Sequence, residues 1–429
     1  SDPAPELTAL RELVHARRAI VAGNPDVTPG EIGAEIGADA AEELGLAPMA
    51  MLHQAIGLLR GGHRDEARGV VETALRHARQ GHHSYLVALG LALLAVIAGN
   101  EGDYRRMTEL AEAADAEPDN PAWQDTLGAL WSSTMRAYGA LLRADPVPCL
   151  ELVSDDTDAP RSVRAGLSAL RTALRGAALF DLGRSGEGID LLQEAQLAAG
   201  TAPDSAEVTA TVALLAHRAA TLLGRGDLAR TVVSWAEGEL GPAGEVVLLR
   251  SRQRAALGRH HAANDTLAPL LAGSAPPVLP WTLIEASVLH CQISLRLDRR
   301  PQARRSLDDA LTSSATMDVL RPLASGPPEV IDLLTRHIGS FGAAEPTALR
   351  VLAARRTLDA QPVSLTDRER AVLSMLPTQR SFEEIAVDLT VSHSTVKTHV
   401  RAIYSKFGVN SRRDAVASAR RYGILITDT

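Results

Sequence analysis

A turn that recurs along the first three quarters of the chain constrains the fold most. At each copy a leucine-rich segment ends at a glycine or a substitute, and the next segment opens with small and charged residues around an alanine. Leucine- and alanine-rich segments favour helix, and glycine at such a point ends a helix in a left-handed conformation. The pattern therefore predicts helix pairs joined by tight turns. The copies lie at residues 59–67, 99–104, 182–186, 223–229, 257–262 and 297–303, with a weaker copy at 141–146.

The spacing of these turns indicates a repeat. Corresponding glycines at positions 62, 102, 183, 226 and 258 are 40, 81, 43 and 32 residues apart, and the longest interval is close to two repeats. This resembles a tetratricopeptide-type array with long, irregular repeats, whose usual period is about 34 residues. A single helix pair cannot bury its apolar side alone, so neighbouring pairs must stack. We expect an all-α array over residues 1–340, with a concave face suited to a peptide, protein or small molecule. Other antiparallel helical arrays would produce the same turns.

Charge separates the end of the chain from the rest. The protein has 429 residues and a net charge of -8, yet residues 364–429 carry 10 Lys and Arg against 7 Asp and Glu. The only two lysines, Lys397 and Lys406, lie in one expected helix there. A basic patch on an acidic body holds phosphate locally while the body keeps non-specific binding weak. We expect a separate domain over residues 364–429, reached through a helical connector and linker at 341–363.

Four helix-start signals follow one another in this last segment. Thr366 with Glu369, and Ser381 with Glu384, have the capping-box spacing in which hydroxyl and carboxylate satisfy each other's free backbone amides. Two further serines begin the third and fourth helices. The segment is therefore predicted to contain four short helices. The two further caps are Ser392 and Ser411.

The third of these helices has one apolar and one polar side. Its apolar residues lie at offsets of 0, 4, 7 and 11, which places them on a single buried stripe. They are Val396, Val400, Ile403 and Phe407. The outward residues form what we call the reading face, which consists of Ser394, Lys397, Thr398, Arg401 and Ser405.

The side chains of the reading face suit contacts with a DNA duplex. Arg401 can donate two parallel bonds to guanine, Lys397 can donate to guanine or phosphate, and the Thr398 methyl group can touch thymine. These three are the predicted base-reading residues. Contacts to the DNA backbone, which hold the register, are predicted for Ser394, Thr395, His399, Lys406, Arg412 and Arg413.

At this point the segment resembles the LuxR-type C-terminal helix-turn-helix domain. The resemblance implies that the third helix, residues 393–407, enters the major groove and that the fourth, residues 411–422, supplies a dimer contact. One departure is visible at residues 376–380, where the family usually has an Ala-Glu-Gly-like bend. The matching motifs are residues 365–373, Glu384-Ile385-Ala386, Thr395-Val396-Lys397-Thr398-His399-Val400, Lys406-Phe407-Gly408-Val409 and Ser411-Arg412.

The pairing of array and module also resembles the C-terminal half of the large ATP-binding LuxR regulators. No Gly-x-x-x-x-Gly-Lys-[Ser/Thr] motif for phosphate binding is present, because both lysines lie in the last helices. We expect a DNA-binding transcriptional regulator whose array receives a signal from an unidentified small molecule or protein, and which binds double-stranded DNA as a homodimer. Two alternatives stay open. One is an interaction scaffold with a degenerate or secondary helix-turn-helix. The other is the output half of an ATP-driven regulator whose ATPase lies outside this chain, which begins with Ser1.

Other candidate sites are weaker. No nucleophile, base and orienting group occur together, so neither an enzyme nor a cofactor is expected. Cys149 and Cys291 lack metal-type or redox-type spacing, which fits a reducing cytoplasm. The longest apolar stretch, residues 85–98, is shorter than the roughly 20 residues that cross a bilayer. Metal binding by the histidine pairs, calcium binding at 155–158 and a ligand cavity lined by tryptophans are each less favoured than structural roles. The pairs and tryptophans are His82-His83, His260-His261, Trp123, Trp131, Trp235 and Trp281.

Overall fold

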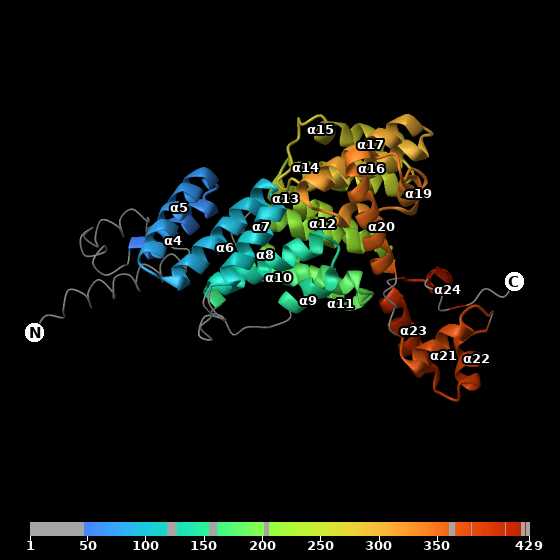
Figure 1. Cartoon of the computed structure of the whole chain (residues 1–429). Helices are drawn as coiled ribbons and strands as arrows, with labels where there is room; N and C mark the ends of the chain where they lie inside the picture. The colour runs from blue at the N-terminus through green and yellow to red at the C-terminus, as the bar shows by residue number, and fades with distance from the viewer. Residues whose placement is uncertain are drawn as a thin grey trace, which may run out of the picture. The chain divides into compact units, whose positions relative to one another are not determined.

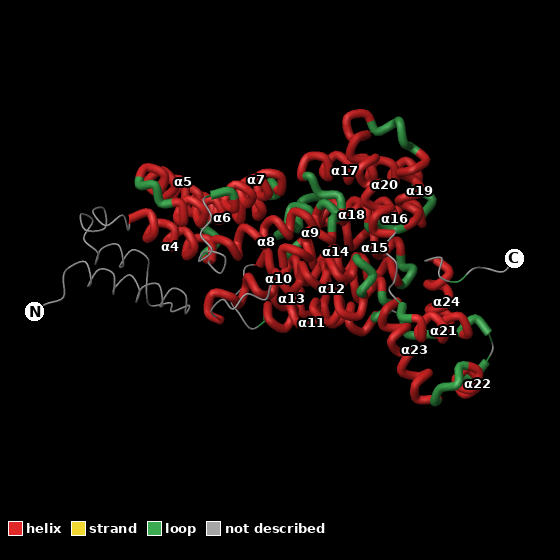
Figure 2. Tube along the Cα trace, turned by 60° about the horizontal axis from the view of Figure 1, so that its bottom comes forward, coloured by secondary structure: helices red, strands yellow, loops and turns green. Residues whose placement is uncertain are grey.

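The described part of the protein is built from helices. The computed structural model describes residues 47–117, 127–153, 161–200, 206–359, 365–378, 380–407, 409–421 and 425. Within these ranges every regular element is a helix and there is no strand (Figure 2). The expected all-α class is therefore confirmed. The candidate calcium segment at 155–158, Trp123 and residues 360–363 of the expected connector and linker lie outside the described residues.

By its contacts the chain divides into two compact units. The first unit comprises residues 1–139, 152–168 and 202–205, and the second comprises 140–151, 169–201 and 206–429. Three of the boundaries between the units fall within helices rather than at turns. The domain boundaries expected at 340 and 364 stay predictions.

The described residues between 47 and 317 contain seven consecutive helix pairs, each pair joined by a short turn (Figure 1). Their sequences explain the helices, since most contain leucine, alanine and arginine and few β-branched runs. The pairs are α4 (Ala47–Arg60) with α5 (Arg64–Gln80), α6 (Ser84–Glu101) with α7 (Tyr104–Asp115), α8 (Leu127–Leu142) with α9 (Pro146–Val153), α10 (Arg161–Asp181) with α11 (Ser185–Ala199), α12 (Ala206–Leu222) with α13 (Gly226–Leu240), α14 (Gly244–Ala256) with α15 (His260–Leu271), and α16 (Thr282–Arg296) with α17 (Arg300–Met317).

The turn within each pair has one shared design. One residue adopts a left-handed conformation, and the next donates its N–H to the carbonyl five residues earlier over 2.8–3.0 Å. This closes the helix end by satisfying carbonyls that the helix leaves without partners. The left-handed residues are Gly62, Gly102, Ala144, Gly183, Gly224, Gly258 and Asp298, with φ between 56° and 87°.

These residues correct the repeat count made from the sequence. Successive left-handed positions are 40, 42, 39, 41, 34 and 40 residues apart, so the interval of 81 is indeed two repeats, divided at Ala144. The use of Gly226 to mark the turn between α12 and α13 was wrong. Gly224 is left-handed with φ 68°, whereas Gly226 is the first residue of α13.

Small residues allow close packing between paired helices. An added Cβ at Gly176 of α10 would lie 2.9 Å from the carbonyl oxygen of Gly188 in α11, and one at Gly188 would lie 2.7 Å from the Gly176 oxygen. Both distances are too short for a side chain. Glycine is therefore required at both positions where these backbones meet.

One helix of the first unit is apolar on all sides. By length and composition α6 is the one helix of the described residues that could cross a membrane, and 67% of it is buried inside the protein. An evenly apolar helix of this kind is the core helix of its unit.

A buried carboxylate holds the proline-rich turn that precedes α16. Glu245 at the start of α14 is fully buried, and its oxygens accept from the N–H groups of Val278 and Leu279 at 3.0 and 2.9 Å and from the Thr282 hydroxyl at 2.8 Å. Irregular backbone cannot satisfy its own buried amides. Glu245 provides the acceptors, which explains why an acidic residue is tolerated in the core.

The chain beyond α17 packs back on the second unit. It forms α18 (Arg321–Ala324), α19 (Pro328–Arg336), the short helix η2 (Gly342–Ala344) and α20 (Glu345–Asp359). Arg321 is 6% exposed and forms a two-pronged ion pair with Asp181 at 2.7 and 3.0 Å. The N–H of Leu320 donates to the Leu142 carbonyl at 2.8 Å. These bonds tie a short segment to helices much earlier in the sequence.

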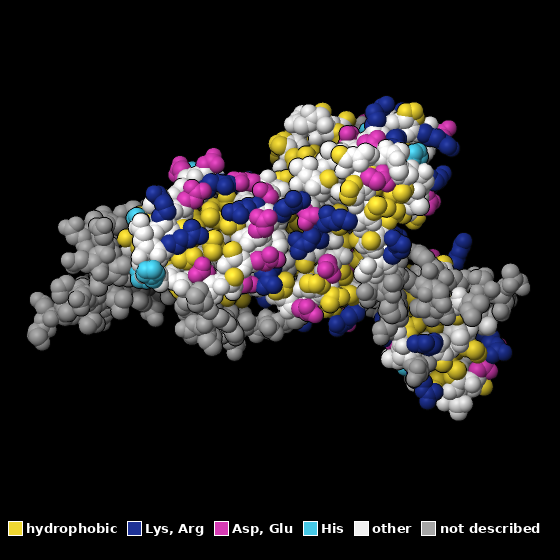
Figure 3. Space-filling view, viewed as in Figure 1, with side chains coloured by type: hydrophobic (Ala, Val, Ile, Leu, Met, Phe, Trp, Pro, Cys, Tyr) yellow, Lys and Arg dark blue, Asp and Glu magenta, His cyan; other side chains and the backbone are white. Residues whose placement is uncertain are grey.

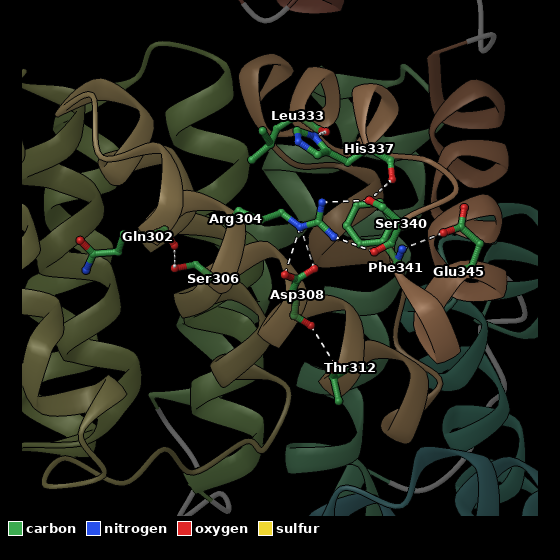
Figure 4. A network of polar contacts seen from close by, with 10 residues as sticks. All are labelled: Gln302, Arg304, Ser306, Asp308, Thr312, Leu333, His337, Ser340, Phe341 and Glu345. Atoms are coloured by element: carbon green, nitrogen blue, oxygen red, sulfur yellow. Dashed lines mark hydrogen bonds and ion pairs between the residues drawn. The ribbon is translucent and has the colours of Figure 1, made fainter.

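The loop before α20 is fixed by a polar network (Figure 4). Arg304 of α17 donates to both oxygens of Asp308, and to the side chain and carbonyl of Ser340 at 3.0 Å each. Its guanidinium lies 4.3 Å from the ring centre of Phe341. Glu345 accepts from the N–H of Phe341 at 3.0 Å. The start of α20 is thereby held on α17.

Candidate nucleic-acid interface

Four short helices at the end of the chain form a small module with its own apolar core. They are α21 (Asp367–Met375), α22 (Phe382–Asp388), α23 (His393–Phe407) and α24 (Arg412–Arg421). The number of helices matches the four predicted starts. The core contains Leu365, Val372, Leu373, Leu376, Ile385, Ala386, Val396, Val400, Ile403, Phe407, Ala415 and Ala419.

The predicted capping boxes are both formed. The Thr366 hydroxyl accepts from the N–H of Glu369, whose carboxylate accepts from the N–H of Thr366 at 2.7 Å. Ser381 and Glu384 exchange the same two bonds at the start of α22. Each box satisfies two amides that a helix start leaves without partners, and so fixes where α21 and α22 begin.

Helix α23 buries the predicted stripe. Val396, Val400, Ile403 and Phe407 are each at most 7% exposed. The reading face lies on the opposite side of the helix, and all five of its residues are exposed. The apolar stripe thus fixes the rotation of α23 about its axis and directs the reading face outward.

The cations of the reading face have no charge partner among the residues that the structure describes. Within the described residues, neither Lys397 nor Arg401 forms an ion pair or side-chain hydrogen bond. The Thr398 hydroxyl donates to the Ser394 carbonyl at 3.0 Å, so its methyl group is the part left for an outside contact. On the side of the module seen in Figure 3, Lys and Arg are the prominent charged side chains.

Hydroxyl groups gather at the start of α23. The Ser392 oxygen accepts from the N–H of Thr395 at 3.0 Å, which confirms it as the cap, and lies 2.7 Å from both the Ser394 and the Thr395 hydroxyl oxygens. Amides and hydroxyls at a helix start suit an anion such as phosphate. The other predicted backbone contacts are less uniform: His399 is half-buried and Arg413 is exposed.

Two predicted backbone contacts have partners inside the module. Lys406 donates to Glu369 at 2.6 Å. Arg412 donates through three nitrogens to carbonyls of the turn between α21 and α22, which are those of Leu376, Thr378 and Arg380 at 2.8, 2.6 and 2.6 Å. Sequence reasoning missed both roles. A signal existed for Arg412, since the carbonyls at the end of α21 need donors.

The turn that Arg412 holds is the one that departs from the expected bend. The Thr378 hydroxyl also donates to the carbonyl of Met375, the last residue of α21, at 2.7 Å. Arg380 forms an ion pair with Asp388 at the end of α22. The unusual sequence at 376–380 is therefore accommodated by bonds from both sides of the turn.

Both cysteines and Trp281 are buried outside the module. Cys149 and Cys291 are buried, and burial raises the pKa of both thiols, that of Cys291 to about 12. Trp281 is 2% exposed and belongs to the core of its unit. The described part of the chain, which includes His260 and His261, contains no group of three or more candidate metal ligands.

A capped helix set behind a smaller one, with polar and cationic residues outward, defines a helix-turn-helix module of the kind that reads DNA. Residues 363–419 match the family described as bacterial regulatory proteins, luxR family. The C-terminal module of this chain is a LuxR-type helix-turn-helix domain, as the sequence motifs predicted.

Known regulators share this part of the chain. The "Probable transcriptional regulatory protein NarL" of Mycobacterium tuberculosis, in strains CDC 1551 and H37Rv, is 43% identical over 82 residues, which are 19% of this chain and 38% of the relative. The "HTH-type transcriptional regulator MalT" of Yersinia enterocolitica is 46% identical over 57 residues, which are 13% of this chain and 6% of that protein. The matched segment thus spans about two fifths of the NarL proteins and a small part of MalT. LuxR-type domains bind DNA and often dimerise.

Proposed function

We propose that the protein is a transcriptional regulator that binds double-stranded DNA through α23, with the helical repeats receiving a ligand or partner signal. The observation that carries this proposal is the reading face of a LuxR-type module, exposed and with two cations that no residue of the described part neutralises. Lys397, Thr398 and Arg401 read base edges in the major groove. Ser394, Thr395, His399 and Arg413 contact phosphates and hold the register.

The geometry of α23 supports this assignment of roles. Arg401 follows Lys397 by four residues, so the two cations lie one turn apart on the same side of the helix. The hydroxyls of Ser394 and Thr395 lie at the helix start, where backbone amides and the helix dipole favour negative charge. Along this face, from the start of α23 onward, the groups that can donate hydrogen bonds to phosphate come first and the base-reading side chains follow.

The first test is a selection of DNA by the full chain from a pool of random duplexes, followed by titration of the enriched duplex. We expect Lys397→Ala and Arg401→Ala each to weaken binding to that duplex by about 1–3 kcal/mol, with relaxed discrimination at the base that each reads. The matched control is Arg370→Ala, which removes an exposed cation of α21.

Two results would contradict the assignment. Equal losses for all three variants would mean that only general charge matters. Failure of the full chain to enrich any duplex at low salt, where phosphate contacts are strongest, would favour the interaction scaffold instead.

A dimer on DNA follows from the same reading. We propose that two modules bind half-sites about one helical turn apart. The enriched duplexes should then contain an inverted or direct repeat with that spacing, and a single uninterrupted site would argue for binding as a monomer.

A further inference from the structure

One carboxylate joins the two helices that frame the module. The Oε2 atom of Glu369, in the first turn of α21, accepts from the Lys406 ammonium at 2.6 Å and from the N–H of Thr366 at 2.7 Å. The Glu369 side chain is 7% exposed and that of Lys406 is 33% exposed. The start of α21 and the end of α23 are therefore held at the same atom.

The charge of this carboxylate is matched inside the module. Burial alone raises the pKa of Glu369, but hydrogen bonds from Lys406 and Thr366 outweigh it, so the pKa lies below its usual value. If Lys406 moved to a phosphate, it would leave a buried carboxylate without its cation, which is unfavourable. The pair as a whole is neutral and gives DNA no net positive charge.

Arg412 is engaged in a similar way from α24. Its Nε and both terminal nitrogens donate to three carbonyls at the end of α21 and in the following turn. Its guanidinium also lies 5.9 Å from the ring centre of Phe382, the first residue of α22. Only a guanidinium offers several donors in a fixed plane, so this contact joins α21, α22 and α24 at one side chain.

The basic residues of α23 and the start of α24 thus fall into two classes. The side chains of Lys397, Arg401 and Arg413 form no ion pair or hydrogen bond with any residue that the structure describes, whereas Lys406 and Arg412 are bound to the module. We propose that Lys406 and Arg412 are positioning residues, which hold the reading helix on its module, and that neither binds a DNA phosphate. This inference rests on the proposed DNA binding and reverses the backbone role predicted for both from the sequence.

Salt dependence separates the two roles. A lysine that neutralises a phosphate contributes about 0.9 to the slope of log affinity against log salt concentration. With the enriched duplex as probe and the full chain as protein, Lys397→Met should lower that slope if Lys397 also touches phosphate. Lys406→Met should leave it unchanged while weakening binding, by about ten- to a hundredfold, because a reading helix displaced by about an ångström loses its contacts.

For Glu369→Gln, the two possible roles of Lys406, as a positioning residue or as a phosphate ligand, predict opposite changes in DNA affinity. As the partner of a positioning lysine, Glu369 is needed, and its replacement should weaken DNA binding as Lys406→Met does. If Lys406 were a phosphate ligand, the same change would free it and remove a negative charge near the duplex, and binding would tighten. Tighter binding by Glu369→Gln, or a slope reduced by about one unit in Lys406→Met, overturns the proposal for Lys406.

Arg412→Lys is the matching test for Arg412, because it keeps the positive charge and removes the planar set of donors. If Arg412 is a positioning residue, Arg412→Lys should weaken DNA binding as much as Arg412→Met does. The slope of log affinity against log salt concentration should stay unchanged in both variants. Full retention of affinity by Arg412→Lys overturns the proposal for this residue.

Amide hydrogen exchange gives a readout that does not need DNA. If the full chain enriches no duplex, the proposed function fails on that result alone. The positioning role is then tested by exchange along α23, which should accelerate in Lys406→Met and Glu369→Gln to a similar extent, and no further in the double variant. Exchange in α23 that stays at the level of the unchanged protein in both single variants overturns it.

Discussion

The buried histidine His217 couples the folding of the second unit to pH. His217 of α12 is 1% exposed, and its Nε2 atom has no hydrogen-bond partner among the described residues. Burial, and next the nearby Arg252, lower the pKa of its imidazole from 6.5 to about 3. The folded protein therefore keeps this ring neutral under conditions in which the unfolded chain protonates it.

The sign of the pH effect follows from linkage. Between the unfolded pKa near 6.5 and the folded pKa of about 3, the unfolded chain binds more protons, so the free energy of unfolding falls as pH is lowered through this window. We expect His217 to account for a loss of about 1.4 kcal/mol between pH 7.5 and 5.5. Denaturant titrations of the protein and of His217→Gln at both pH values measure it. Equal losses in the two proteins would show that the ring does not carry the effect.

At the scale of elements, the turn within each helix pair depends on one backbone conformation. Gly224, between α12 and α13, has φ 68° and no heavy atom within 4 Å of an added Cβ. Steric clashes with neighbours therefore play no part there, and only the left-handed backbone disfavours a side chain. Gly226, two residues on, has the same open surroundings, with Arg230 nearest at 3.7 Å, but it begins a helix.

This contrast gives a paired prediction. Gly224→Ala should destabilise the protein by about 1–2 kcal/mol, the cost of a left-handed conformation for an L-residue. Gly226→Ala should stabilise it by about 0.4–1 kcal/mol, because alanine restricts the unfolded chain at a compatible position. Thermal or denaturant unfolding of the two variants compares them directly. Destabilisation by Gly226→Ala rather than by Gly224→Ala would restore the repeat register counted from the sequence.

At the scale of the whole molecule, one ion pair ties the end of the repeat region to its middle. Arg321 and Asp181 are 140 residues apart in sequence and nearly fully buried, and the segment that carries Arg321 leads on to α20. Burial of such a pair costs desolvation that good geometry offsets. The pair therefore specifies where this segment docks more than it adds to net stability.

Removing one partner or both should have different results. We expect Asp181→Asn to cost about 3–5 kcal/mol, because it leaves a buried guanidinium without its counter-charge, and Asp181→Leu with Arg321→Met together to cost far less. Denaturant unfolding of the single and double variants forms the comparison. A double variant as unstable as Asp181→Asn would mean that the ion pair adds net stability, and that its main role is not to specify where the segment carrying Arg321 docks.

The sequence alone determined the local features of this protein. Hydrophobic spacing predicted the buried stripe of α23, capping residues predicted where α21 and α22 begin, and leucine-glycine turns predicted the helix pairs. Each of these depends on residues within a few positions of one another, since helix periodicity and end-capping are local effects.

Only the tertiary structure decided which cations are free. The partners of Lys406 and Arg412 lie 37 and 32–36 residues away, and that of Arg321 lies 140 away. In the sequence Lys406 and Lys397 are equivalent basic residues of one helix. Packing brings a buried carboxylate to one of them and leaves the other exposed, and such long-range meetings are not encoded in any local pattern.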